Sequence, residues 1–418
     1  MAGVQQDSEP IVADRAVSRD LFARPDRPRK ALLAIVALAL TWRILLSMVG
    51  TISSNVLDDV RPDASREVHQ QLEAARLDVS DWRPVHLWFN WDALHYENLS
   101  RTWFEIERPV APNVITATGG RAWNEFSWPP LYPVGVGVLH WLTRIEAGLL
   151  MVLGGLALFV GFLALVRRIA IADGDDAPTV NATVLLNAAA PFAFFLGTPL
   201  SEPLFVVLAA VVLLATRRNN WLLASVAAAL MVWTRMNGVF MVVPLAVAGV
   251  LAIRAADERT PRRYLEAFAP PTICLAAFGA YLGFARWLSG TARAPFLTQK
   301  YGWGNTAGNP ITNLLGNLDR WQYITVALYL IAVVWLLARR WLPPVDATYC
   351  FVMLLAATTV ARTFGAAPRY VAVAFPVVSA IARWSTARKA NNLVLPISAA
   401  LQAAFFVMWA NYWLTIMY

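Results

Sequence analysis

Long apolar runs separated by short polar breaks occupy most of the chain after residue 130. An α-helix rises about 1.5 Å per residue, so roughly 20 apolar residues cross the hydrocarbon core of a bilayer. The pattern therefore predicts an all-α polytopic membrane protein with about eleven transmembrane helices. The runs, of which the shorter ones are candidates for re-entrant or tilted segments, are 31–49, 134–142, 147–166, 180–196, 203–216, 221–233, 239–253, 267–288, 323–338, 347–361, 370–382 and 393–414.

Three polar stretches interrupt this pattern. Residues 1–30 are basic and contain prolines, which predicts a disordered cytoplasmic tail before a single transmembrane domain, 31–418. Residues 51–127 follow the first apolar run, and because a structureless loop of that length is unusual, we expect it to be partly helical and functional. The third stretch is the loop 289–322.

Composition and charge agree with a membrane protein. The 418 residues are 58% hydrophobic and only 15% charged, whereas roughly a quarter of the residues in a soluble domain are charged. The net charge of +8 comes largely from arginines in short loops, which is typical of topology control and not of nucleic-acid binding. Cys274 and Cys350 lie inside apolar runs, so neither a disulfide framework nor a cysteine metal site is expected.

Basic pairs predict which ends of the apolar runs face the cytoplasm. If all of them do, then Asp92, Glu202, Arg235, Arg369 and the loop 289–322 share the opposite side. This assignment requires an odd number of crossings between residues 134 and 166, where either of two runs could be the true span. The pairs are Arg167-Arg168, Arg217-Arg218, Arg262-Arg263, Arg339-Arg340 and Arg388-Lys389.

An acid stands among aromatic residues in the first long loop, in the stretch from Trp88 to Tyr96. If Asn90 caps a short helix, then Asp92 lies in its first turn, with His95 and Tyr96 about one turn further on. Tryptophan and tyrosine are enriched at the membrane–water interface, so this helix is expected at the bilayer surface. Asp92 either acts on a polar head group presented there or merely complements the helix dipole.

Ionisable residues also occur inside or at the ends of apolar runs. Arg43 must reach the interface or face other helices. Glu202 and Arg235 either form a structural pair or face a cavity together with Arg369 and Tyr370. Charged groups at such depth are costly, which favours a functional site. In the loop 289–322, the aromatic and amide groups suit sugar binding, although any interfacial aromatic loop looks similar; they include Gln299 and Trp303.

Taken together, these stretches resemble the PIG-V-like mannosyltransferases, which belong to the GT-C class of membrane glycosyltransferases. The matching motifs follow the order of that family across most of the chain. They are Asn90-Trp91-Asp92-Ala93-Leu94-His95-Tyr96, Trp128-Pro129-Pro130-Leu131-Tyr132-Pro133, Pro199-Leu200-Ser201-Glu202-Pro203-Leu204-Phe205, Thr234-Arg235-Met236-Asn237-Gly238, Gln299-Lys300-Tyr301-Gly302-Trp303-Gly304 and Pro368-Arg369-Tyr370.

The resemblance implies a GT-C-like helical bundle that transfers mannose from a polyprenyl-phosphate donor to a lipid-linked or glycan acceptor at the non-cytoplasmic face of the cell membrane. We expect neither a cofactor nor a metal. One-step inversion needs a base opposite the leaving group, and Asp92 is the candidate. Arg235 and Arg369 are the candidates for holding the donor phosphate. His95, Tyr96, Glu202, Gln299, Trp303 and Tyr370 are expected to bind substrate.

Two other functions compete with this one. A polyprenyl-phosphate or lipid transporter would contain an inverted repeat with discontinuous helices in matching halves, and no such self-similarity is visible. A structural scaffold would not need charges gathered on one face. The large acidic first loop favours an enzyme.

Overall fold

The computed structural model describes residues 22, 28–57, 87–89, 92–103, 128–301, 305–359 and 366–411. The regular elements in this part of the chain are all helices. In chain order they are α1 (Pro28–Val56), α4 (Asp92–Thr102), α6 (Leu131–Thr143), α7 (Ala147–Ala172), α8 (Ala177–Ala189), η3 (Ala193–Gly197), α9 (Glu202–Arg217), α10 (Trp221–Thr234), η4 (Met236–Met241), α11 (Val242–Ala255), α12 (Pro261–Ser289), α13 (Ala294–Tyr301), α14 (Pro310–Leu315), α15 (Trp321–Ala338), α16 (Pro344–Ala356), α17 (Ala367–Val373), α18 (Phe375–Ala387) and α19 (Asn391–Ala410).

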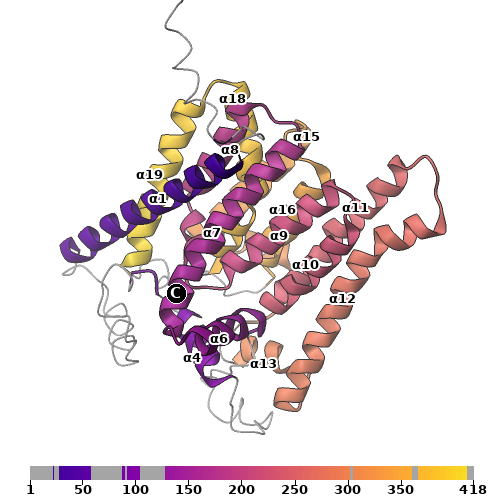
Figure 1. The fold of residues 1–418 in the computed structure, drawn as a ribbon, viewed down its shortest axis with the longest axis horizontal. Coiled ribbons are helices and arrows are strands. Elements are labelled where there is room, and N and C mark those ends of the chain that lie inside the picture. Colours follow the sequence, from indigo (N-terminus) through magenta and orange to yellow (C-terminus); the bar gives the residue numbers. More distant parts are fainter. Residues whose placement is uncertain are drawn as a thin grey trace, which may run out of the picture.

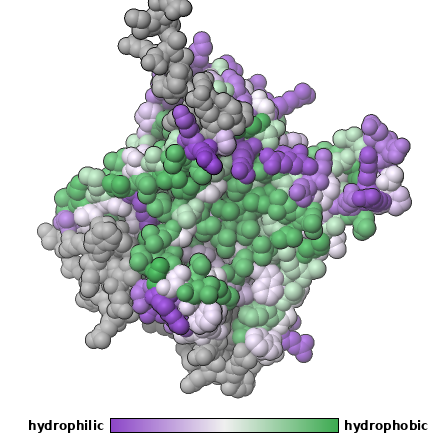
Figure 2. Space-filling view, viewed as in Figure 1, coloured by the Kyte–Doolittle hydropathy of each residue, from purple (hydrophilic) through white to green (hydrophobic). Residues whose placement is uncertain are grey.

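Six spans in the described part of the chain are long and apolar enough to cross a membrane: α1, α7, η4 with α11, α12, α15 and α19. The pair α17–α18, bent by 57° between its two halves, makes a seventh if it is counted as one span. Figure 2 shows the result as an apolar belt across the middle of the molecule with polar groups gathered toward its ends. The predicted class, an all-α polytopic membrane protein, is confirmed.

The number of full-length spans is smaller than the eleven or so that the apolar runs predict. Among the described helices, α6, α8, α9, α10 and α16 contain only 13 to 16 residues. At about 1.5 Å per residue these reach roughly 20–24 Å, short of the ~30 Å core. The run 180–196 illustrates the reason: α8 ends at Ala189, before Pro191, and the chain continues as η3, because proline cannot continue a helical hydrogen-bond ladder.

Of the two runs between residues 134 and 166, the second is the span. α7 is a candidate crossing, whereas α6 lies with α4 at one end of the bundle (Figure 1). Gly137 permits this packing, because a Cβ there would come within 2.6 Å of the Ser100 carbonyl oxygen of α4. Pro129 and Pro130 precede α6, and Pro133 lies in its first turn, where a missing N–H breaks no helical hydrogen bond.

Ion pairs tie several helix ends together at the opposite end of the bundle. Arg217, in the last turn of α9, lies 2.6 Å from both Asp173 and Asp346. Arg383 of α18 lies 2.6 Å from Asp173 and 2.9 Å from Asp175. These contacts join the ends of α7, α9 and α18 to the start of α16. We call this the basic end, because α7, α9 and α18 also end there in the basic pairs; the end that holds α4, α6 and α13 is the site end (Figure 1).

Part of the predicted tail belongs to the folded body. Helix α1 begins at Pro28, so residues 28–30 are helical. Phe22 is buried; its N–H donates to Asn181 Oδ1 at 3.1 Å, and its carbonyl accepts from Arg167 Nε. The other residues of the predicted tail lie outside the described residues.

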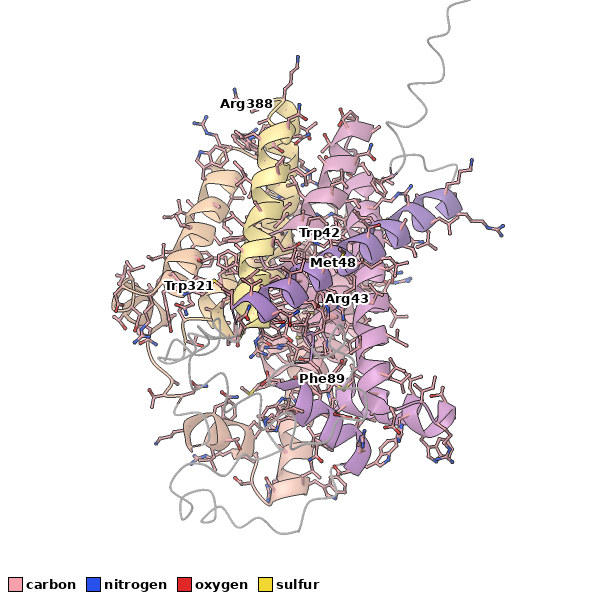
Figure 3. All side chains as sticks on the ribbon, turned by 90° about the vertical axis from the view of Figure 1, so that its left-hand side faces the viewer. Trp42, Arg43, Met48, Phe89, Trp321 and Arg388 are labelled. Carbon is pink, nitrogen blue, oxygen red and sulfur yellow. The ribbon has the colours of Figure 1, made fainter. Side chains whose placement is uncertain are left out.

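Arg43 of α1 faces the other helices; this was one of the two positions that the sequence allows, the other being the membrane interface. Its Nη1 donates to the Gly197 carbonyl at 2.6 Å, and its Cζ lies 3.3 Å from the centre of the Trp88 ring. Trp88 Nε1 in turn donates to Ser47 Oγ, one turn further along α1, at 2.9 Å. Figure 3 shows α1 crossing the bundle at a slant, with Arg43 between Arg388 at the basic end and Phe89 near the site end. One helix therefore holds two segments that lead into the site.

Candidate functional site

Four charged side chains from four segments meet at the site end, and we call them the charge cluster: Asp92, Glu202, Arg235 and Arg369. Arg369 Nη1 lies 2.5 Å from Asp92 Oδ2, and its Nε lies 3.4 Å from Glu202 Oε1. Arg235 Nη1 lies 2.5 Å from the same Glu202 oxygen. Glu202 is 1% exposed, so the cluster is a chain of alternating charges with a carboxylate at its most buried point.

Local geometry explains where each member stands. Glu202 is the first residue of α9, and Pro203 next to it suits the first helical turn. Arg235 ends α10 in an extended conformation. Gly238 then lets the chain turn tightly into η4, because a Cβ there would lie 2.5 Å from the Met231 backbone. Each charged residue thus stands at a helix end, where the backbone leaves the apolar bundle.

Arg369 lies in α17, a helix of only seven residues. A break at Ala374 separates it from α18, and such a break leaves backbone carbonyls without helical partners. Tyr349 of α16 donates its hydroxyl to the Val373 carbonyl at 2.9 Å, and Cys350 lies against the Ala374 carbonyl. α16 thereby fixes the short helix that carries Arg369.

A pair of hydroxyl groups makes a second connection between α4, which carries Asp92, and the other members of the charge cluster. Tyr96 and Ser201 share a hydrogen bond between their hydroxyl oxygens at 2.7 Å, and Arg235 Nη1 donates to Ser201 Oγ at 3.1 Å. The Tyr96 ring stands edge-on to the Tyr132 ring of α6, with 5.1 Å between centroids. Burial raises the pKa of Tyr96 far above its ordinary value, so its hydroxyl stays protonated at neutral pH.

Protonation states in α4 follow from opposing effects. Burial raises the pKa of the Asp92 carboxyl, but the Arg369 charge and hydrogen bond outweigh it and hold that pKa below its ordinary 3.8. Burial lowers the pKa of His95 from its ordinary 6.5, against a smaller opposite effect of Asp92. At neutral pH the site therefore contains an ionised Asp92 beside a neutral His95.

The remaining predicted site residues lie at different distances from the charge cluster. The His95 ring stacks on Trp128 with 4.7 Å between centroids, and the Tyr370 ring centre lies 6.0 Å from Arg235 Cζ. Gln299, in α13, accepts from the Asn305 side chain at 2.7 Å. Trp303 lies outside the described residues, as does Asn90, the predicted cap of α4. Among described residues, no hydrogen bond joins Gln299 to the charge cluster.

Without substrate the charge cluster is electrically balanced, with two carboxylates and two guanidinium groups. Both Glu202 oxygens lack a well-oriented hydrogen bond in the described part of the chain, although Oε1 is in ion-pair contact with both arginines. Among described residues, no group of three His, Cys, Asp or Glu side chains is placed to ligate a metal. The arrangement can bind an anion by exchanging a carboxylate for it, and it can accept a proton at Asp92.

Sequence reasoning missed three residues of this region. Ser201 is next to Glu202, and Tyr132 belongs to the proline-rich motif that leads into α6. Both are part of the motifs quoted above, but nothing in the sequence distinguishes them as site residues. Arg43 was noticed only as a charge in an apolar run. Its role depends on the Gly197 carbonyl, and a backbone acceptor leaves no trace in a sequence pattern.

The spans and the charge distribution define a polytopic helical membrane protein. No family model and no curated protein matches the chain. Among solved structures, it is similar to the crystal structure of the Archaeoglobus fulgidus oligosaccharyltransferase tethered with an acceptor peptide, with 13% identity and a TM-score of 0.38. The match covers 90% of this chain and 54% of that one, so the chain spans about half the length of the oligosaccharyltransferase. The function proposed below rests on the charge cluster and not on this likeness.

Proposed function

We propose that the protein is an inverting glycosyltransferase that moves mannose from polyprenyl-phosphate mannose to an acceptor hydroxyl at the non-cytoplasmic face of the membrane. The observation that carries the proposal is the charge cluster, in which a buried pair of arginines and an ionised carboxylate stand together at the site end. A lipid-linked donor needs phosphate-binding groups at a membrane interface and a base beside them. The resemblance of the sequence motifs to the PIG-V-like family supports mannose as the sugar.

Arg369 is suited to exchange one anion for another. Its contact with Glu202 is long, at 3.4 Å, whereas its contact with Asp92 is 2.5 Å and uses a different nitrogen. A donor phosphate oxygen takes the place of Glu202 on Arg369, and Arg235 assists from the other side of Glu202. Guanidinium groups match phosphate oxygens in bidentate fashion, which favours arginine at both positions.

The reaction then balances with the residues at hand. The acceptor oxygen forms a bond to the anomeric carbon while the bond from that carbon to the phosphate oxygen breaks. The leaving polyprenyl phosphate takes the electron pair, and the acceptor proton passes to Asp92. The low pKa of Asp92 makes it a weak base, so proton transfer occurs late, when the attacking hydroxyl has become acidic.

An apolar cavity beside the charge cluster supports a lipid-linked donor. It has a volume of about 320 Å³ and lies between α6, α10 and α12. Trp233, two residues before Arg235, is in its wall, and such aromatic surface suits a hydrocarbon chain. We assign the first isoprene units of the donor to it. Its lining residues are Trp103, Pro130, Leu131, Val134, Trp233, Phe284, Trp287 and Leu288.

The test is transfer by the purified protein. Polyprenyl-phosphate mannose and a membrane lipid extract are supplied, and mannosylated products are identified by mass spectrometry. With the wild type we expect mannosylated product and free polyprenyl phosphate. With Asp92→Asn we expect the transfer rate to fall by about 10²–10⁴-fold, because the amide cannot accept the proton. The amide oxygen can still accept the Arg369 hydrogen bond but the ion pair is lost, so some loss of thermal stability is expected and rates are compared at a temperature at which the variant is fully folded.

Two outcomes contradict the proposal. Most of the wild-type turnover in Asp92→Asn removes Asp92 as the base. If the wild type binds the donor without transferring sugar, but moves polyprenyl phosphate between the leaflets of proteoliposomes, the protein is a transporter instead.

A further inference from the structure

One buried hydroxyl at the site end makes no hydrogen bond to any described residue. Tyr132, in the first turn of α6, is 5% exposed, and its hydroxyl makes no hydrogen bond within the described part of the chain. A buried polar group without a hydrogen bond is costly, because it has lost its hydrogen bonds to water without replacing them. Such groups are rare in folded proteins and call for a specific explanation.

The surroundings of Tyr132 place it against the charge cluster. Its ring meets the Tyr96 ring at 5.1 Å, and the Tyr96 hydroxyl is already engaged with Ser201 next to Glu202. Burial raises the pKa of Tyr132, and the nearby Tyr96 and Glu202 raise it further. The hydroxyl is therefore a protonated donor within electrostatic reach of the Glu202 carboxylate.

Glu202 offers the complementary group. Its Oε2 makes no hydrogen bond among the described residues, whereas its Oε1 lies 2.5 Å from Arg235 Nη1 and 3.4 Å from Arg369 Nε. An open donor and one open acceptor oxygen thus belong to the same region of the site. A sugar hydroxyl has the matching chemistry, because it accepts one hydrogen bond and donates another.

We propose that the Tyr132 hydroxyl donates to a hydroxyl of the transferred sugar, and that Glu202 accepts from the same hydroxyl or its neighbour on the ring. This assignment rests on the proposed glycosyl transfer, since the sugar beside a phosphate held by the two arginines lies next to Glu202. Tyr132 then determines specificity: a site with groups placed for a hydroxyl rejects an analogue that lacks it.

The variant Tyr132→Phe separates substrate binding from folding. Removing a hydroxyl that makes no hydrogen bond among the described residues should not lower thermal stability, so a loss of transfer in a variant of unchanged stability is not due to a damaged fold. We expect kcat/KM for polyprenyl-phosphate mannose to fall roughly tenfold or more, the usual effect of losing one hydrogen bond to a polar partner.

A series of donors with deoxy sugars identifies the hydroxyl. If Tyr132 binds the hydroxyl at one ring position, the donor lacking that hydroxyl should lower kcat/KM of the wild type about as much as Tyr132→Phe lowers it with the natural donor. With Tyr132→Phe, kcat/KM should be the same for this deoxy donor as for the natural donor. Thr183→Val is the matched control, because the Thr183 hydroxyl of α8 is also buried without a partner among described residues. This control should keep both its stability and its activity. By contrast, Tyr349→Phe should lower thermal stability, because its hydroxyl has a partner.

The outcomes distinguish this inference from the function on which it rests. If the wild type transfers sugar but Tyr132→Phe matches it with every donor, the glycosyltransferase stands and the role of Tyr132 is wrong. A fall in thermal stability of Tyr132→Phe comparable to that of Tyr349→Phe also overturns it, because the hydroxyl then has a structural partner. If the wild type neither binds nor transfers the sugar, the proposed function fails first.

Discussion

Asp92 and its neighbours set the chemistry of the site at the scale of single residues. Burial alone would keep this carboxyl protonated to higher pH, whereas Arg369, with a smaller contribution from Arg235, stabilises the ionised form. The second effect wins because the guanidinium lies 2.5 Å away. The group proposed to accept a proton is thus ready at neutral pH, and its neighbour His95 is uncharged.

A pH–rate profile tests this protonation state. The activity requires ionised Asp92, whose pKa lies below 3.8, so kcat should be flat from about pH 5 to 8 and should fall only in more acidic solution. His95→Gln should leave the acidic limb where it is. A limb near the ordinary pKa of histidine that disappears in His95→Gln would transfer the role of base to His95.

Lysine substitutions test the phosphate role of the two arginines. Arg369 contacts two carboxylates through different nitrogens, and lysine keeps the charge but not this fork. We expect Arg369→Lys to raise the apparent KM for the donor about 10-fold or more, with little change for the acceptor, and Arg235→Lys to act in the same direction. Steady-state kinetics with each substrate varied in turn decides the case.

Arg293 supplies the matched control for these substitutions. It is exposed in the loop before α13, so Arg293→Lys should leave both KM values unchanged. If Arg369→Lys behaves like this control, the arginine only balances the buried carboxylates.

At the scale of elements, close contacts with neighbouring helices fix the position of the segment 197–202, which ends at Glu202. α7 passes so near it that a Cβ on Gly155 would lie 2.6 Å from the Thr198 carbonyl oxygen, whereas a Cβ on Gly154 meets nothing within 4 Å. Arg43 holds the Gly197 carbonyl from the other side. The position of Glu202 therefore depends on α1 and α7, neither of which contributes a charge to the cluster.

Two neighbouring glycines make a matched pair of variants. Gly155→Ala must displace the 197–202 segment, at a cost typical of overpacking, about 1–3 kcal/mol, so both thermal stability and transfer should fall. Gly154→Ala fills open space and should raise helix stability by up to about 1 kcal/mol with activity unchanged. Equal thermal stabilities and rates for the two variants would show that the close approach does not position the site.

Sequence patterns predicted most of the apolar helices and offered the Glu202–Arg235 pair, which the structure contains, but not the contact between Asp92 and Arg369. Asp92 and Arg369 are visible because charges in apolar or aromatic surroundings are costly. Their contact joins residues 277 positions apart, and no local pattern encodes a pairing at that separation. The choice of α7 over α6 as the span depends on helix length, 26 residues against 13, and the apolar runs alone did not fix where these helices begin and end.

At the scale of the whole molecule, the two ends differ in charge. Ion pairs and basic pairs occupy one end, and the charge cluster occupies the other (Figures 1 and 3). Positive residues are retained on the cytoplasmic side, so we expect the site end to face outward. Asp175, at the basic end, lies 2.9 Å from Arg383, and this network joins the helix ends there.

Cysteine labelling tests this orientation without background, because Cys274 and Cys350 are both buried. Ala307, at the site end, and Arg388, at the basic end, are exposed. With a membrane-impermeant thiol reagent, Ala307→Cys should be labelled in intact cells and Arg388→Cys only after permeabilisation. The reverse pattern would place the charge cluster in the cytoplasm.

Arg43 also constrains how the chain enters the membrane during synthesis. Its hydrogen-bond acceptor, Gly197, follows it by 154 residues, which at roughly 5–20 residues per second are made about 8 to 30 s later. An arginine at the centre of a lone helix in lipid costs roughly 2.5–3.5 kcal/mol. We therefore expect α1 to stay beside the insertion machinery until η3 has been made, and the first helices to enter the bilayer as a group.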